Sequence, residues 1–195
     1  MRRLWAIDLG GQAGRGIAID PRAPGGDGLR ADFQQGLPIR DSSVDIIYAY
    51  HVLEHVEDLL AFIEELWRVC KPNALVYAWV PHASSPYTQW ADPTHKRGFL
   101  IETFSFFGTY KPARFDVEAT RLHFSTRKRP GRARPLRLFL STMLEALANR
   151  SRSAQYRCER WWGHWLGFEE ALVVLRAVKD DPRRLAHVAK AQARD

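Results

Sequence analysis

Hydrophobic and polar residues follow two different periods in the middle of the chain. The run Val44–Tyr50 is short and rich in β-branched and aromatic residues, and the turn-forming residues 41–43 precede it, so it predicts a buried strand. Apolar side chains then recur at helical spacing, at Leu59, Phe62, Ile63, Leu66, Trp67 and Cys70. Lys71–Asn73 is expected to end this helix, and the apolar run 74–80 predicts a second strand. Such a strand–helix–strand unit implies parallel strands and a right-handed crossover.

Two shorter apolar runs precede this unit. Residues 4–9 predict one strand, and Ile17–Asp20 predicts another that ends in an acid. Glycines between them, among them Gly10 and Gly11, allow positive φ angles and let a ligand approach the backbone closely. A tight turn without a ligand explains the same glycines equally well.

The acid at the end of the second strand, Asp20, suits a ribose, because one carboxylate can accept hydrogen bonds from both vicinal hydroxyls. Dinucleotide-binding folds use the same arrangement, so Asp20 alone does not define the cofactor. The loop after Asp8 lacks the G-x-G-x-x-G spacing, and no helix fits before Ile17. Since a pyrophosphate binds at a helix N-terminus, this loop favours a cofactor without phosphate.

Two more strands are predicted near the C-terminus, at Phe115–Phe124 and Phe168–Lys179. An insertion at about residues 125–166 separates them. It contains a basic linker, an amphipathic helix at Leu136–Ala148 and a stretch rich in Arg and Trp. Basic and aromatic residues together are typical of nucleic-acid and anionic membrane interfaces. We favour a third interpretation, a solvated linker and a helix that covers an exposed face of the sheet.

The composition fits one domain. Of 195 residues, 46% are hydrophobic, which is enough for a single core. We expect one domain over residues 1–179, which includes the insertion, and a charged tail at 180–195. The net charge of +7 favours an anionic partner or surface. Two cysteines make no disulfide framework. Because no run has the length of a signal peptide or transmembrane helix, we expect a cytoplasmic protein, with peripheral membrane contact as an alternative.

Four short sequence words, in a fixed order, carry a family resemblance. They are L-P at Leu37, D-S-S-V-D at the strand start, V-L-E-H-V after the strand, and E-L-W-R-V-C-K-P at the helix end. With these words the chain resembles the class I S-adenosylmethionine (SAM)-dependent methyltransferases of type 11, from Asp8 to about Lys179. The resemblance implies SAM as the cofactor. It also implies a Rossmann-like α/β fold, in which a C-terminal antiparallel hairpin closes a mostly parallel sheet.

The resemblance assigns residues to SAM. In this family the acid that ends the second strand binds the ribose, which gives Asp20 this role. The glycine loop holds the methionine part, which corresponds to Asp8, Gly10 and Gly11.

Three further residues complete the implied cofactor site. An acid and an apolar residue after the third strand surround the adenine in this family, and Asp32 and Phe33 match them. A plain turn is the other interpretation of Asp32. Tyr50, at the carboxyl end of the fourth strand, is expected to line the cofactor cleft, where its ring can face the cationic sulfonium.

The first two crossover helices of the family have no room in this chain, which therefore resembles a compact branch. Only eight residues separate Asp8 from Ile17, and Pro21–Arg30 is rich in proline and glycine, whereas a parallel crossover takes a dozen or more residues. Both missing helices belong to one face of the sheet, and parallel sheets are rarely bare on one side. We expect the C-terminal segment, a second subunit in a homodimer or a membrane surface to cover this face.

Acid–base candidates lie mainly in the long loop after Pro81, near the carboxyl end of a strand, where ligands bind in open α/β sheets. A short helix is predicted to follow at Ile101–Phe107. A hydroxyl acceptor would need a general base, and histidine suits neutral pH. Our order of candidates is His82, His95 and then His51. Capping and turn formation are the alternative roles of the loop residues.

The pentapeptide His51–His55 matches the H-x-x-E-H pattern of inverted zinc proteases. Two histidines four residues apart on a helix share a face and could bind zinc. This pentapeptide, however, lies at a strand-to-helix junction, and V-L-E-H-V is part of the methyltransferase pattern. We therefore expect no metal site, and we expect His55 to orient the start of the helix. A regulatory or structural metal at His82, Asp92 or His95 is an alternative, although nothing in their spacing requires it.

We expect a SAM-dependent methyltransferase with a small-molecule or glycan-type acceptor. A nucleic-acid methyltransferase is one alternative, which the positive charge favours. Against it, amino-methylating DNA enzymes carry an N-P-P-Y-like word where this chain has Tyr48–His51. A non-catalytic, methyltransferase-like binding or scaffold domain is the other alternative, which the shortened glycine loop favours.

Overall fold

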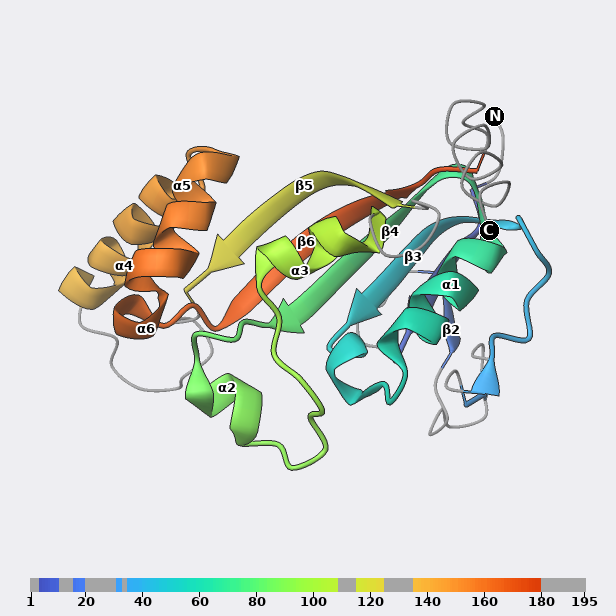
Figure 1. The fold of residues 1–195 in the computed structure, drawn as a ribbon, viewed down its shortest axis with the longest axis horizontal. Coiled ribbons are helices and arrows are strands. Elements are labelled where there is room, and N and C mark those ends of the chain that lie inside the picture. The colour runs from blue at the N-terminus through green and yellow to red at the C-terminus, as the bar shows by residue number, and fades with distance from the viewer. Residues whose placement is uncertain are drawn as a thin grey trace, which may run out of the picture.

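The centre of the protein is a six-stranded sheet (Figure 1). The computed structural model describes residues 4–10, 16–19, 31–32, 35–108, 115–124 and 135–179. The strands are β1 (Ala6–Leu9), β2 (Ile17–Ile19), β3 (Val44–Tyr50), β4 (Cys70–Pro81), β5 (Phe115–His123) and β6 (Glu170–Ala177). Their order is β2-β1-β3-β4-β6-β5. The first four are parallel, and β6 and β5 are antiparallel to their neighbours. The predicted fold class is therefore confirmed.

The predicted strand–helix–strand unit consists of β3, α1 (Leu59–Val69) and β4. Asp58 caps the helix, because its Oδ1 accepts a hydrogen bond of 2.9 Å from the Ala61 N–H. The helix ends where predicted. The strand, however, begins at Cys70, before the predicted run 74–80, because Cys70 already pairs with Val44 of β3. Residues 71–74 bulge between this pair and the next one, Ile46 with Leu75, so the continuous pairing begins within the predicted run.

The remaining helical segments are short, apart from α4 in the insertion. They are η2 (Leu53–His55), α2 (Pro86–Trp90), α3 (Ile101–Ser105), η3 (Phe106–Gly108), α4 (Pro135–Ala148), α5 (Arg152–Arg157), the π-helical η4 (Cys158–Trp162) and α6 (Gly163–Leu166). The helices predicted at 101–107 and 136–148 are confirmed as α3 with η3 and as α4. Within the part of the chain that the structure describes, no helix is long and apolar enough to cross a membrane.

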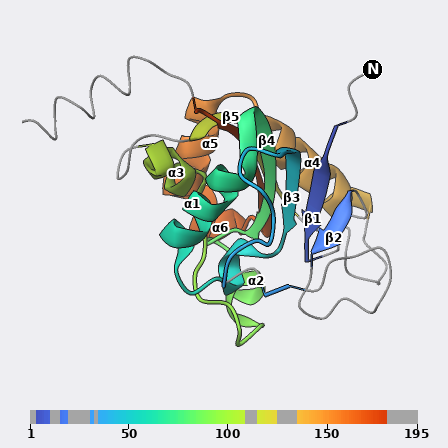
Figure 2. The same ribbon diagram turned by 90° about the vertical axis from the view of Figure 1, so that its right-hand side faces the viewer.

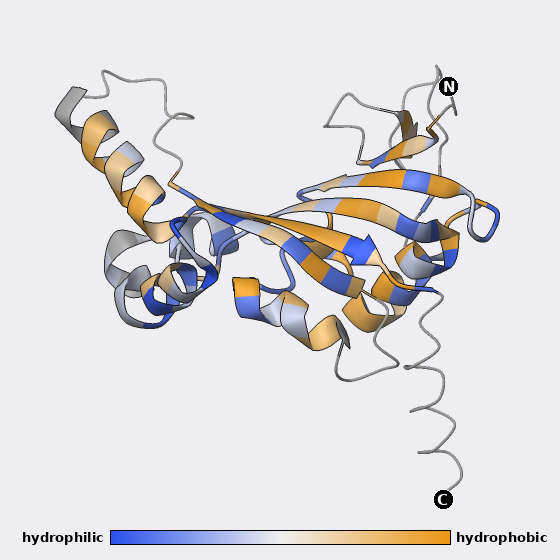
Figure 3. Cartoon of the chain, turned by 90° about the horizontal axis from the view of Figure 1, so that it is seen from above, coloured by the Kyte–Doolittle hydropathy of each residue, from blue (hydrophilic) through white to orange (hydrophobic). Residues whose placement is uncertain are grey.

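One face of the sheet is the core. Its small and β-branched side chains are buried: Ile47, Ala49, Val76, Ala78, Val80, Ala171, Val173 and Leu175. Helices α1 and α3 lie on this side, as two perpendicular views show (Figures 2 and 3). Four apolar residues of α1 are buried against the core cluster: Phe62, Ile63, Leu66 and Val69.

The opposite face is aromatic and half-buried, and we call it the open face. Tyr48 and Tyr50 of β3 lie beside Tyr77 and Trp79 of β4, and the ring centroids of Tyr48 and Tyr77 are 5.4 Å apart. Figure 3 shows no helix over the middle of this face among the described residues.

The connection between β1 and β2 is too short for an ordinary crossover. The two strands are parallel, although only residues 10–16 join them. Gly16 has a φ of +85°, and a Cβ on it would lie 2.5 Å from the Ala6 carbonyl oxygen, so a glycine is required where the chain passes β1. Residues 11–15, and the strand expected before Asp32, lie outside the described part.

Helix α4 projects from one end of the sheet, on the side of the open face (Figures 2 and 3). It contacts the end of β5, where Glu145 Oε1 lies 3.3 Å from Arg121 Nη2 and 3.1 Å from His123 Nδ1. It does not cover the central strands, contrary to the interpretation that we favoured. Its apolar stripe stays exposed, at Phe139, Leu140, Met143 and Leu147.

Candidate cofactor and acceptor site

The carboxyl ends of three parallel strands meet at one edge of the sheet. Leu9 of β1 pairs with Ile19 of β2 on one side and with Ala49 of β3 on the other. The residues that follow these strands therefore leave the sheet side by side. In open α/β sheets this edge is where ligands bind.

Gly10 closes the end of β1. Its φ is +80°, and its N–H donates a hydrogen bond of 2.9 Å to the Ile19 carbonyl. A Cβ at this position would lie 3.3 Å from Val52 Cγ2. The turn and the packing against Val52 are thus sufficient to require glycine here, and contact with a ligand would be an additional role.

Asp8 and Tyr50 lie near Gly10, on the open face. Asp8 is 1% exposed and pairs with Tyr48, which is two residues before Tyr50 on the same side of β3. A nearly buried carboxylate and an aromatic ring thus share this edge. Both groups are suited to a cation.

The other predicted cofactor residues are partly outside the described chain. Gly11, Asp20 and Phe33 are not among the described residues. Asp32 is exposed, and its Oδ2 accepts a hydrogen bond of 3.0 Å from Gln35 Nε2. Its backbone carbonyl also accepts from the Gln35 N–H, so Asp32 forms the kind of turn that the plain interpretation predicted.

A cavity of about 330 Å³ lies between this turn and α1. Its lining is Gln35, Gly36, Val56, Glu57, Asp58, Ala61, Phe62 and Glu65. The volume is at the lower end of the range for small-molecule sites. A part of a cofactor or a small acceptor would fit there.

His51 follows Tyr50 directly and is held by two carboxylates. Its Nδ1–H donates to Glu54 Oε1 at 2.9 Å, and its Nε2–H donates to Glu170 Oε1 at 3.2 Å. Burial lowers the pKa of His51, but the hydrogen bonds to Glu170 and Glu54 outweigh it and raise the pKa to about 9. His51 is therefore a cation at neutral pH. It also has a positive φ of 52°, which is strained for a residue with a side chain.

His82 lies at the end of β4 and is fully buried. The Ser84 N–H donates to His82 Nδ1 at 3.1 Å, and the Ser84 hydroxyl lies 2.8 Å from the same nitrogen. On the other side, His82 Nε2 lies 2.8 Å from Glu159 Oε1. The order of these contacts is that of a serine–histidine–acid relay.

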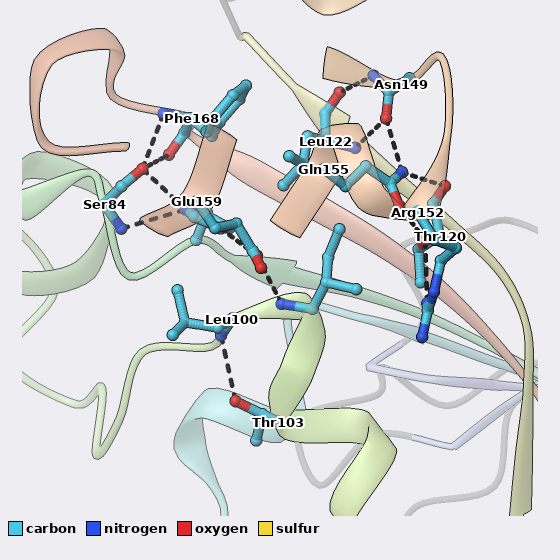
Figure 4. Close-up of polar contacts among 12 residues, drawn as sticks. Ser84, Leu100, Thr103, Thr120, Leu122, Asn149, Arg152, Gln155, Glu159 and Phe168 are labelled. Atoms are coloured by element: carbon cyan, nitrogen blue, oxygen red, sulfur yellow. Dashed lines mark hydrogen bonds and ion pairs between the residues drawn. The ribbon is translucent and has the colours of Figure 1, made fainter. Parts of the chain in front are cut away.

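The surroundings of Ser84, His82 and Glu159 indicate a structural role, and we call these three residues the clamp. Ser84 Oγ also accepts from the Phe168 N–H at 2.9 Å, and Glu159 Oε1 accepts from the Ile101 N–H at 2.7 Å (Figure 4). All three polar side chains are nearly buried. The network joins the end of β4 to the insertion and to α3.

His95 lies in the loop after α2, beside His55. The two ring centroids are 4.8 Å apart in an edge-to-face arrangement. His55 does not cap α1, which Asp58 does. The structure thus places His51 at the edge where Tyr50 lies, His82 in the clamp, and His95 beside His55.

The comparison with known proteins begins with a family. Residues 15–78 match the sequence profile of a methyltransferase domain. This segment includes β2, β3 and α1 and most of β4. Among curated protein sequences, no relative matches the chain.

Solved structures with the same fold include several methyltransferases. A SAM-dependent methyltransferase from Archaeoglobus fulgidus has a TM-score of 0.55 at 14% identity, with coverage of 89% of this chain and 86% of that chain. The complex between the Haloferax volcanii Trm112 methyltransferase activator and a candidate methyltransferase gives a TM-score of 0.57 at 19% identity, with coverage of 89% and 82%. The [4+2]-cyclase SpnF gives 0.53 at 17% identity, with coverage of 91% and 75%.

Residues 15–78 thus match a methyltransferase domain family, and the chain has the fold of SAM-dependent methyltransferases. The cofactor of this family is SAM. Its ammonium and sulfonium groups are cationic, and it has no phosphate. The described edge fits these properties of SAM, because it combines the nearly buried carboxylate of Asp8, the ring of Tyr50 and the turn at Gly10.

Sequence reasoning missed three partners of the candidate histidines. Glu170 lies 119 residues from His51, and Glu159 lies 77 residues from His82. No local pattern marks contacts of that separation. Ser84 could have been found, because a serine two residues after a histidine can donate its N–H to the ring.

Proposed function

We propose that this methyltransferase transfers the SAM methyl group to a small-molecule or glycan-type acceptor. The observation that carries the proposal is that Asp8, Gly10 and Tyr50 lie at the carboxyl ends of two adjacent parallel strands, β1 and β3. When bound, SAM supplies the electrophilic methyl group. The protein then has to align the acceptor and exclude water.

The charges near this edge support a cationic cofactor. His51 is a cation between two carboxylates, Glu54 and Glu170, so the three side chains together carry a net charge of −1. Asp8 adds a further carboxylate to the same region. We propose Asp8, Gly10, Gly11 and Tyr50 for the methionine and sulfonium part of SAM.

The contacts of the three candidate histidines favour a role in positioning other groups over a role as the base that removes a proton from the acceptor. His51 has a carboxylate on each ring nitrogen, and the exposed fraction of His82 is 0%. The Nδ1–H of His95 donates to the Gln89 carbonyl at 3.0 Å. His82, His95 and His51 were the expected bases for a hydroxyl acceptor, but a cationic His51 has no lone pair to accept the proton and His82 is fully buried, so we propose that these histidines position other groups. An acceptor that loses its proton easily would need none of them.

Calorimetric titration of the purified chain with SAM and with S-adenosylhomocysteine tests this function. We expect one site with micromolar affinity for both, because the two compounds share the ribose, the adenine and the amino acid part. Transfer of a labelled methyl group would then be measured on glycans and small metabolites. A folded chain that binds neither compound would contradict the proposal and favour the non-catalytic alternative. SpnF, a [4+2]-cyclase with the same fold, is an example of this fold in a protein named for a reaction other than methyl transfer.

The nucleic-acid alternative predicts a different dependence of binding on salt concentration. Binding that neutralises phosphates weakens steeply as the salt concentration rises, with a slope of roughly −0.9 per phosphate contact on a log–log plot. Transfer to a small neutral acceptor has no such dependence. The salt slope therefore separates the two acceptor classes.

We also infer that the insertion contacts an anionic membrane surface. Three of its indoles are exposed, Trp161 by 67%, Trp162 by 58% and Trp165 by 86%, and Arg160 lies over the Trp161 ring at 5.8 Å. Exposed indoles next to cationic side chains are typical of proteins that lie on a bilayer. The exposed apolar stripe of α4 belongs to the same insertion. Both cysteines are free, which fits the reducing cytoplasm that we propose as the location.

Co-sedimentation with phosphatidylcholine vesicles, with and without phosphatidylserine, tests this contact. Replacing Trp161 and Trp165 by serine should lower partitioning at least ~10-fold, because each indole buries about 150 Å² or more of apolar surface at about 25 cal/mol per Å². Trp90→Ser is a matched control, since Trp90 in α2 is also 67% exposed. Equal partitioning of the double variant and the native chain would contradict the inference.

A further inference from the structure

Two loops far apart in the sequence bring together three potential metal ligands. Glu54 and His55 end η2, directly after β3, and His95 lies in the loop after α2. Potential ligand atoms of these three residues all lie within 4.8 Å of one another. The Lys96 N–H donates to the Glu54 carbonyl at 2.7 Å, so the backbone already holds the two loops together.

Hydrogen bonds assign the free nitrogen of each ring. The His95 Nδ1–H donates to the Gln89 carbonyl at 3.0 Å, which leaves the lone pair on Nε2. The Thr94 hydroxyl donates to Asp92 Oδ1 at 2.6 Å, so it accepts from the His55 Nδ1–H at 2.9 Å. His55 thus also keeps its lone pair on Nε2. Metal-binding histidines commonly donate their second ring N–H in this way.

Glu54 supplies an independent observation. Its side chain is 0% exposed, and Oε1 accepts from His51 at 2.9 Å. Oε2 is buried and has no hydrogen-bond partner among the described residues. A buried carboxylate oxygen without a partner costs free energy, and a cation beside it would remove this cost.

We propose that Glu54, His55 and His95 bind one divalent transition-metal ion of the zinc class. Asp92 is the fourth ligand, because its half-exposed Oδ2 lies 4.0 Å from His95 Nε2. Two neutral imidazoles and two carboxylates balance the charge of a divalent ion. Imidazole ligands favour zinc over magnesium or calcium. Four ligands also match the tetrahedral coordination of structural zinc, for which ligand atoms lie roughly 3.4 Å apart at bond lengths of about 2.0–2.1 Å.

This site differs from the H-x-x-E-H site that the sequence suggested. That motif would use His51 and His55 as ligands and Glu54 as the base. Here both nitrogens of His51 face carboxylates, and the second histidine comes from the loop after α2. The ion would fix the Asp92–His95 turn onto η2, close to His51 and the cofactor edge, so its role is positional.

Zinc titration of the tag-free chain, stripped with a chelator, tests the proposal. We expect one ion per chain by calorimetry, a rise in Tm on saturation, and a tetrahedral absorption spectrum when cobalt replaces zinc. His95→Gln and His55→Gln should each weaken binding at least ~100-fold, more than the ~10- to 100-fold typical of outer-shell changes. His123→Gln is the matched control, because His123 lies on the outermost strand, β5, and pairs with Glu145 of α4.

The fold of each variant is checked without metal. A metal-free variant with the Tm of the metal-free native chain is folded, so its loss of zinc binding reports the site. A folded native chain that takes up no stoichiometric zinc would overturn the proposal. Unchanged zinc affinity in both His95→Gln and His55→Gln would overturn it as well.

Discussion

Replacing Asp20 with alanine is expected to weaken SAM binding roughly 30- to 150-fold, which corresponds to about 2–3 kcal/mol lost with hydrogen bonds to a charged group. The physical reason is that one carboxylate serves both vicinal ribose hydroxyls, and alanine leaves both without an acceptor in the site. The residue before it, Ile19, ends β2 beside Leu9 and is fully buried. Calorimetric titration with SAM measures the change.

Asp27→Ala is the matched control for this variant. It removes the same charge from the same stretch of sequence, between β2 and residue 31, but we assign it no contact with SAM. Native affinity in Asp27→Ala together with weak binding in Asp20→Ala would confirm the ribose assignment. Equal SAM affinity in a folded Asp20→Ala variant and the native chain would show that another group holds the ribose.

Replacing Phe168 with alanine is expected to lower the free energy of unfolding by about 3–5 kcal/mol, as for other buried phenylalanines. Phe168 is fully buried, and its ring centroid lies 4.5 Å from that of Phe124 and 5.5 Å from that of His82. Its N–H also donates to Ser84 in the clamp. The cavity therefore opens beside the network that joins β4 to the insertion. Urea unfolding followed by circular dichroism measures the loss.

Two further variants complete this experiment. Phe168→Leu fills most of the cavity and should cost roughly 1 kcal/mol, so it stays folded if the alanine variant does not. Phe106→Ala is the control at an exposed phenylalanine, with a side chain 43% exposed, and should change stability by about 1 kcal/mol or less. If Phe168→Ala unfolded at the same urea concentration as the native chain, the structural role of the clamp would be contradicted.

The order of elements around β3 and α1 was predictable because the signals are local. The β-branched and aromatic run Val44–Tyr50 lies within β3, and the helical spacing from Leu59 to Trp67 lies within α1. The antiparallel pair β5 and β6 was also predicted, although the insertion separates its strands. Helix α2 was missed, although Ser85 as an N-cap and Pro86 in the first turn were visible signals.

The candidate site was predictable only where it follows the ends of strands. Asp8, Gly10 and Tyr50 come at the ends of β1 and β3, and parallel strands bring their carboxyl ends to one edge. The proposed metal ligands were not predictable as a set. His55 and His95 are 40 residues apart, and the H-x-x-E-H pattern pointed to His51 instead.

The sequence by itself determined the resemblance to methyltransferases, the parallel sheet and the edge where the cofactor is expected, because short-range periodicity and motif order specify strands and their ends. Only the tertiary structure decided what each histidine does. The groups that face the two ring nitrogens decide whether a histidine is a cation, part of the clamp or, as we propose for His95, a metal ligand. Glu170 and Glu159 reach His51 and His82 from distant parts of the sequence. The tertiary structure also decided that α4 does not cover the open face, since the position of α4 depends on contacts with β5 that no local pattern encodes.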